Sequence, residues 1–161
     1  MAVEGPASAA LLSLERALRE RHLTIAVAES CSGGLVAAAL TKLPGSSDFF
    51  VGGVVTYSNR SKISLLGVPS ELIAAHGAVS RECAEAMAGG ALRLFGSDLA
   101  LSVTGIAGPA AEGTKPVGLT FLGVARGGRV VVREHRWGGD RASNRAASVE
   151  AALDLGLEVL R

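Results

Sequence analysis

The side chains that could act as nucleophiles gather in two short polar stretches of the sequence. One is Glu-Ser-Cys-Ser-Gly-Gly at residues 29–34, and the other is the serine pair that follows Pro44-Gly45. None of the three histidines stands in a context typical of a Ser-His-Asp triad, so a serine here needs another base. A thiolate at Cys31 is a second option, although a small buried cysteine is the commoner explanation. The candidate nucleophiles are therefore Ser30, Cys31, Ser32 and Ser47.

Lysine usage points to a candidate base. The chain has only three lysines, Lys42, Lys62 and Lys115, among its 16 basic residues. A buried lysine can release its proton, whereas a guanidinium stays protonated under protein conditions. Lys62 follows the end of an expected strand and lies five residues after Tyr57, the one tyrosine. A Ser-Lys pair is the economical arrangement, and the alternative is a surface lysine on a short helix.

The turn at residues 29–34 is also a candidate anion site. The backbone amides of Ser32, Gly33 and Gly34 would point outward at the start of a helix. The positive end of a helix dipole favours a carboxylate, a phosphate or a developing oxyanion. The alternative is an ordinary strand-to-helix turn in which Ser30 or Ser32 caps the helix.

Two arginines at the start of the last expected helix form a second candidate anion site. Arg141 and Arg145 are four residues apart and share one helix face, in the first turns after an expected cap at Asp140. Like charges repel at this spacing, and both oppose the helix dipole. An anion bound between them would explain the pair, while two solvated arginines, at a cost of about 0.3 kcal/mol, are the alternative.

The hydrophobic pattern predicts the elements that position these residues. We expect strands over 24–28, 51–57, 98–104, 117–125 and 129–137, and helices over 8–22, 35–43, 62–66, 69–76, 81–95 and 140–160. Strands that alternate with helices need crossover connections, so the order indicates an α/β fold with helices on both sides of a mixed, mostly parallel sheet. Ligands of such sheets collect beyond the carboxyl ends of the parallel strands, which here are followed by residues 29–34, 58–62 and 105–109.

Composition bounds the function. The 161 residues are 48% hydrophobic and 19% charged, which predicts a single domain over 1–161. A net charge of +1 argues against nucleic acid as a partner. Without a signal peptide or a long apolar run, and with two cysteines, we expect a cytoplasmic protein with no membrane partner. The histidines lack ligand spacing, so no metal is expected. The apolar excess predicts a homodimer or higher homo-oligomer.

Several longer motifs, taken together, resemble the CinA carboxy-terminal domain family. They run in order from about Leu11 and cover nearly the whole chain: Ala28-Glu29-Ser30-Cys31-Ser32-Gly33-Gly34, Gly45-Ser46-Ser47, Gly53-Val54-Val55-Thr56-Tyr57-Ser58-Asn59 with Lys62, His76-Gly77-Ala78-Val79-Ser80, Thr104-Gly105-Ile106-Ala107-Gly108-Pro109, Lys115-Pro116-Val117-Gly118 and Gly139-Asp140-Arg141. The resemblance implies a three-layer α/β/α sandwich. It also implies an amidohydrolase that converts nicotinamide mononucleotide to nicotinate mononucleotide and ammonia, in its stand-alone form and without a cofactor.

The resemblance also implies roles for individual residues. Ser47 is implied as the nucleophile, Lys62 as its base and Tyr57 as an aid to proton transfer. The implied substrate contacts, together with those expected from the loops and the arginine pair, are Ser30, Ser32, Gly33, Gly34, Thr104, Gly105, Arg141 and Arg145. Arg141, with Arg145 and a helix start, is expected to bind the 5′-phosphate.

A function of another class is the alternative to this enzyme. The same pocket could serve a non-catalytic nucleotide-binding module linked to competence or the DNA-damage response. Binding alone would not require a lysine that can lose its proton, so the set of Ser47, Tyr57 and Lys62 favours the enzyme. Turnover of nicotinamide mononucleotide would separate the two.

Overall fold

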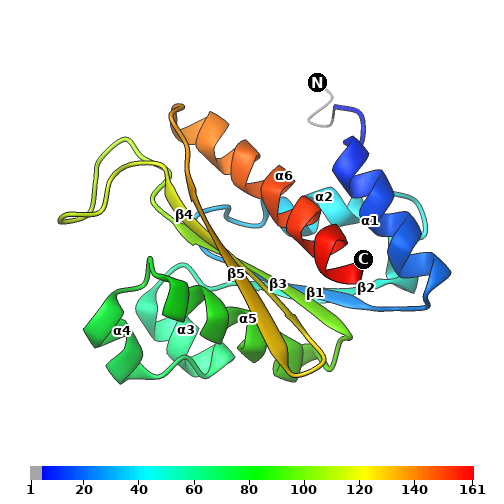
Figure 1. Cartoon of the computed structure of the whole chain (residues 1–161), viewed down its shortest axis with the longest axis horizontal. Helices are drawn as coiled ribbons and strands as arrows, with labels where there is room; N and C mark the ends of the chain where they lie inside the picture. The colour runs from blue at the N-terminus through cyan, green and yellow to red at the C-terminus, as the bar shows by residue number, and fades with distance from the viewer. Residues whose placement is uncertain (1–4) are drawn as a thin grey trace.

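A mixed five-stranded sheet forms the middle layer of the computed structural model, which describes residues 5–161 (Figure 1). Its strands, in spatial order, are β2 (Phe50–Val55), β1 (Ile25–Glu29), β3 (Leu99–Gly105), β4 (Leu119–Arg126) and β5 (Arg129–Arg136). β1 pairs in parallel with β2 and β3, whereas β4 pairs antiparallel with β3 and β5. Four of the five strands therefore point the same way, and the expected mixed, mostly parallel sheet is confirmed.

Helices cover both faces of the sheet. One layer holds α1 (Ala9–Glu20), α2 (Leu35–Thr41) and α6 (Arg141–Leu160), and the other holds α3 (Asn59–Leu66), α4 (Ser70–His76) and α5 (Arg81–Phe95) (Figure 1). The three-layer sandwich is thus also confirmed. All five residues of β1 are buried, as expected for a short apolar strand with helices on both faces.

Local sequence explains where the helices begin. Ser8, Ser58, Ser80 and Asp140 each accept a hydrogen bond through a side-chain oxygen from the backbone amide three residues later. Ser58 caps α3 at Asn59, so this helix begins three residues before the expected start and Lys62 lies one turn inside it.

Two other details differ from expectation. A short 3-10 helix, η1 (Ser46–Asp48), lies between α2 and β2, where no element was predicted. β4 begins at Leu119 instead of residue 117, because Gly118 has a φ of 89° and packs against the backbone of Trp137. The left-handed conformation and the lack of room for a side chain both favour glycine there.

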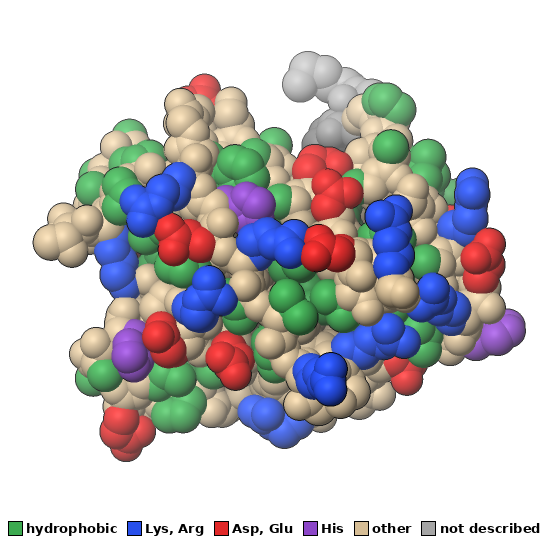
Figure 2. All heavy atoms as spheres, viewed as in Figure 1, with side chains coloured by type: hydrophobic (Ala, Val, Ile, Leu, Met, Phe, Trp, Pro, Cys, Tyr) green, Lys and Arg blue, Asp and Glu red, His purple; other side chains and the backbone are tan. Residues whose placement is uncertain are grey.

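Charge is distributed without a large patch of one sign on the face shown in Figure 2, where basic and acidic side chains are interspersed. Among residues 5–161, no helix combines the length and the apolar character needed to span a membrane. The same part of the chain holds no group of three or more His, Cys, Asp or Glu side chains placed around a common metal position.

Candidate active site

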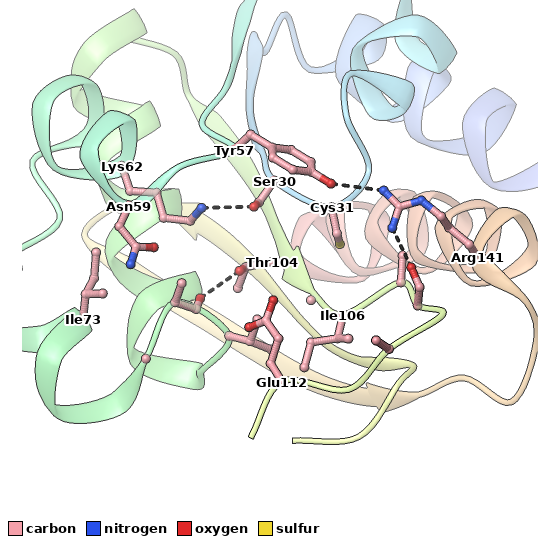
Figure 3. A pocket seen from close by; sticks show the side chains of 17 residues that line it. Ser30, Cys31, Tyr57, Asn59, Lys62, Ile73, Thr104, Ile106, Glu112 and Arg141 are labelled. Carbon is pink, nitrogen blue, oxygen red and sulfur yellow. Dashed lines mark hydrogen bonds between the residues drawn. The ribbon is translucent and has the colours of Figure 1, made fainter. Parts of the chain in front are cut away.

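A cavity of about 510 Å³ opens at the carboxyl edge of the parallel strands (Figure 3). Its walls come from the end of β3 and the segments after β1, β2 and β3, from α4 and the α4–α5 connection, and from the first residue of α6. This is the edge at which ligands of α/β sheets collect. The three loops that the sequence singled out at strand ends therefore meet in one cavity.

Lys62 and Ser30 lie side by side in this cavity. Lys62 is only 1% exposed, and its Nζ lies 3.0 Å from Ser30 Oγ and 2.6 Å from the Thr56 carbonyl oxygen. Side chains in a helix tilt toward its N-terminus, so a lysine one turn into α3 reaches back to the strand ends. The structure thus places the predicted base at hydrogen-bonding distance from a serine of the first loop.

Burial changes the acidity of this lysine. Desolvation disfavours the ammonium and lowers the pKa of Lys62, while nearby Cys83, Cys31 and Glu112 oppose that shift more weakly. A neutral amine can donate to the Thr56 carbonyl and still accept the Ser30 hydroxyl proton on its lone pair. The arrangement suits a base whose partner is Ser30.

Ser47 lies elsewhere, and its predicted pairing with Lys62 is wrong. It is exposed on η1, which precedes β2, whereas Lys62 follows the opposite end of that strand. Six residues of strand separate the two by roughly 20 Å at about 3.3 Å per residue. Ser47 also does not line the cavity. The two residues are near in sequence, but the intervening strand carries the chain from one edge of the sheet to the other.

The expected anion site at the start of α2 is filled by the protein itself. The Glu29 carboxylate, 1% exposed, accepts hydrogen bonds from Ser32 Oγ at 2.6 Å and from the amides of Gly34, Val36 and Ala37 at 2.8–3.1 Å. The helix end therefore binds a carboxylate, but an internal one. Ser32, Gly33 and Gly34 do not line the cavity, and their prediction as substrate contacts is wrong. They shape the turn that carries Ser30.

The two arginines of α6 have separate roles. Arg145 donates from Nε to the Cys31 carbonyl at 3.2 Å and from a terminal nitrogen to the Ser32 carbonyl at 3.1 Å. It does not line the cavity, so the expectation that it binds the phosphate is wrong. Its two hydrogen bonds hold the turn that carries Ser30.

Arg141, the other predicted phosphate ligand, lines the cavity. Its terminal nitrogens donate to the Gly108 carbonyl at 2.7 Å and to the Tyr57 hydroxyl at 3.1 Å. A guanidinium has five N–H donors, so donors remain for a bound anion after these two contacts. Tyr57 also lines the cavity, but in Figure 3 its hydroxyl points toward Arg141 and away from Lys62. Its position does not suit the predicted role in proton transfer to or from the lysine.

Thr104 and Gly105, which are predicted substrate contacts, both line the cavity. The Thr104 hydroxyl donates to the Ala78 carbonyl at 2.8 Å and so holds the α4–α5 connection against β3. A side chain on Gly105 would come within 2.7 Å of Thr120 Oγ1 and 2.9 Å of the Leu119 carbonyl oxygen. Glycine is needed there because β4 approaches closely.

Cys31 borders the cavity, yet its environment does not favour a thiolate. Its side chain is 7% exposed, and burial is the main cause that raises its pKa to about 11. A thiol with this pKa stays protonated at neutral pH and is a poor nucleophile. Ser30 is then the nucleophile candidate that the geometry favours.

Three residues in or beside the candidate site escaped the sequence prediction. Glu29 was quoted only within a motif, and Asn59 and Glu112 line the cavity without having been proposed. A buried carboxylate at the end of a strand and before a helix could have indicated the role of Glu29. Nothing local distinguishes Glu112 from other loop carboxylates, because the fold alone brings its loop to the cavity.

Comparison with known proteins gives consistent matches. The model of the CinA C-terminal domain matches residues 8–160. A CinA-like protein of Chloroherpeton thalassium is 52% identical over 149 residues, which cover 89% of this chain and 35% of that protein. The chain thus spans about a third of the length of the curated relatives it matches.

Solved structures agree with the sequence matches. A CinA superfamily protein from Klebsiella pneumoniae superposes with a TM-score of 0.91 at 35% identity, over 94% of this chain and 95% of that one. The competence/damage inducible protein CihA from Agrobacterium tumefaciens superposes with a TM-score of 0.89 at 40% identity, over 99% of each chain.

Proposed function

Because the chain belongs to the CinA C-terminal domain family, we propose that it is an amidohydrolase that converts nicotinamide mononucleotide to nicotinate mononucleotide and ammonia. The observation that carries the proposal is the 3.0 Å approach of the buried Lys62 amine to the Ser30 hydroxyl inside a cavity. A serine and an adjacent base are the minimum that nucleophilic acyl transfer requires. The cavity volume of about 510 Å³ falls in the range of small-molecule sites.

The first half of the proposed reaction releases ammonia. Neutral Lys62 takes the Ser30 proton as Oγ bonds to the carboxamide carbon, and the carbonyl electron pair moves to oxygen. The lysine, now protonated, is a cation close to the developing negative charge. Collapse of the tetrahedral intermediate breaks the C–N bond, and Lys62 gives its proton to the departing nitrogen. The products of this half are ammonia and an ester on Ser30.

Water completes the cycle. Lys62 takes a proton from the water that attacks the ester carbon, and then returns it to Ser30 Oγ as the C–O bond to serine breaks. The released product is a carboxylate. Throughout, Glu29 and Arg145 hold the turn that carries Ser30, through bonds to its amides and carbonyls respectively.

Arg141 supports a nucleotide as substrate rather than free nicotinamide. It lies in the cavity wall on α6, and in Figure 3 it is on the far side from Lys62. A guanidinium binds a phosphate through paired charge-assisted hydrogen bonds. A substrate with a carboxamide at one end and a phosphate at the other would fit between Ser30 and Arg141.

The direct test is ammonia release by the purified protein with nicotinamide mononucleotide, nicotinamide and NAD as substrates. We expect turnover of the mononucleotide and loss of that turnover in Lys62→Met. The value of kcat/KM should rise as the pH increases past the pKa of Lys62, which burial lowers, because only the neutral amine accepts the serine proton. Binding of the mononucleotide without ammonia release would favour the non-catalytic module instead.

A further inference from the structure

One carboxylate lines the cavity, and it belongs to Glu112 on the connection between β3 and β4. Two backbone hydrogen bonds between Glu112 and Lys115 close a tight turn at this point, with N···O distances of 3.2 and 2.9 Å. The Lys115 amine donates to the carbonyls of His76 and Val79 at 2.7 and 2.5 Å, which ties the turn to the α4–α5 connection. The position of Glu112 is therefore built into the fold.

The Glu112 side chain has no protein partner within the part of the chain that the structure describes. Across residues 5–161 its carboxylate takes part in no hydrogen bond or ion pair. Figure 3 shows the carboxylate directed into the cavity, next to Thr104 and Ile106. An anionic group that faces a ligand cavity with its oxygens free is available to a cationic part of a ligand.

An aromatic ring lies across the cavity from this carboxylate. Tyr57 and Glu112 both line the cavity, and in Figure 3 the Tyr57 ring lies above Ser30 and Glu112 below it. Tyr57 is 60% exposed, and its hydroxyl accepts a hydrogen bond from Arg141 at 3.1 Å, which directs the phenol oxygen toward Arg141. The face of an aromatic ring attracts a cation, as a carboxylate does.

We propose that Glu112 and Tyr57 form a subsite for the cationic ring of the substrate, which selects a positively charged pyridinium over a neutral ring of the same shape. This inference rests on the proposed function, because it concerns the ring that carries the carboxamide. A ring between Tyr57 and Glu112 would present its carboxamide to Ser30 and its sugar phosphate to Arg141. Arg141 is a cation in the cavity wall, and the Glu112 carboxylate would offset its repulsion of a cationic ring.

The test compares two ligands that differ in ring charge. Nicotinamide mononucleotide has a cationic ring, and its reduced dihydro form has a neutral ring with the same carboxamide, ribose and phosphate. We would measure KM for the first from ammonia release and Ki for the second as a competitive inhibitor, at low ionic strength. In Glu112→Gln we expect KM to rise because the attraction between the carboxylate and the cationic ring is lost. The rise should be only about fivefold, because Glu112 is solvent-exposed and water screens its charge. Ki of the reduced form should stay unchanged.

Two further variants complete the experiment. Glu71→Gln removes an exposed carboxylate of α4 that does not line the cavity, and it should alter neither constant. Tyr57→Leu removes the aromatic face and should raise KM more than Ki. Equal changes of KM and Ki in Glu112→Gln, or no change in KM, would overturn the inference while ammonia release still upheld the proposed function. Absence of ammonia release from the unmodified protein would overturn both.

Discussion

Two serine-bearing turns of this chain are built from similar parts at opposite edges of the sheet. The turn at 29–34 follows β1, and the turn at 45–48 precedes β2. Each contains a glycine with positive φ, a serine and a carboxylate. Each is also held by an arginine from a flanking helix, since Arg145 donates to two carbonyls of the first turn, and Arg19 donates to the Gly45 carbonyl of the second turn and to that of Pro44 just before it.

The two turns differ in burial and in what reaches them. Glu29 is 1% exposed and accepts four hydrogen bonds, whereas Asp48 is exposed and pairs with Arg19 at 2.7 Å. At the carboxyl edge three parallel strands end together, and the residues after β2 bring Lys62 to Ser30. The residue composition of the two turns does not reveal which of them lies at the cavity. The direction of the strands decides this, because the first turn follows a parallel strand and the second precedes one.

The largest difference between the two turns is expected when the serine of each turn is removed. Ser30→Ala should lower kcat for ammonia release roughly 10³-fold or more, because no other nucleophile adjoins Lys62 with the same geometry. Ser47→Ala should stay within about twofold of the unmodified protein, because the residue is exposed and distant from the cavity. Full activity in Ser30→Ala would contradict the assignment of Ser30 as the nucleophile, provided that circular dichroism shows both variants folded.

The second-largest difference is expected between the carboxylates of the two turns, Glu29 and Asp48. Here the measured quantity is the free energy of unfolding. Glu29→Gln turns an amide N–H₂ toward buried donors, and we expect a loss of about 3 kcal/mol. Asp48→Asn should change the free energy of unfolding very little, because water screens an exposed ion pair. Urea denaturation followed by fluorescence of Trp137 would measure both, and equal losses would contradict the contrast in burial.

The arginines should show a smaller contrast, in kcat. Arg145→Ala removes two bonds to the turn that carries Ser30, so we expect kcat to fall about tenfold with KM little changed. Arg19→Ala acts on the turn at 45–48 and should leave kcat unchanged. Steady-state kinetics decides between them. A rise in KM in Arg145→Ala, with constant kcat, would instead indicate contact with the substrate.

The smallest effect is expected at Cys31. A thiol whose pKa is raised to about 11 holds its proton through the neutral range and does no nucleophilic work there. Cys31→Ala should therefore change kcat less than about threefold. In the unmodified protein, ultraviolet absorbance at 240 nm should show no thiolate from this residue below pH 9. A large loss of activity in Cys31→Ala would reopen thiol chemistry.

Sequence patterns predicted the fold closely because the elements are short and sharply bounded. The apolar run at 24–28, the serine and aspartate caps and the hairpin at residues 126–128 each leave a local signal. Prediction was weaker at the site. Ser30, Lys62, Tyr57, Thr104, Gly105 and Arg141 do share the cavity, whereas Ser32, Gly33, Gly34 and Arg145 support it from outside.

The residue types alone determined that this chain offers candidate serine nucleophiles, a candidate lysine base and two candidate arginines for an anion, because those properties belong to single side chains. Only the tertiary structure decided which serine meets the lysine and which arginine faces the cavity. Such pairings depend on strand direction and helix packing, which bring residues 32 or more positions apart into contact and carry near neighbours in sequence to opposite edges. The position of Glu112 in the cavity was also decided only by the tertiary structure, because its loop reaches the cavity through contacts with the α4–α5 connection.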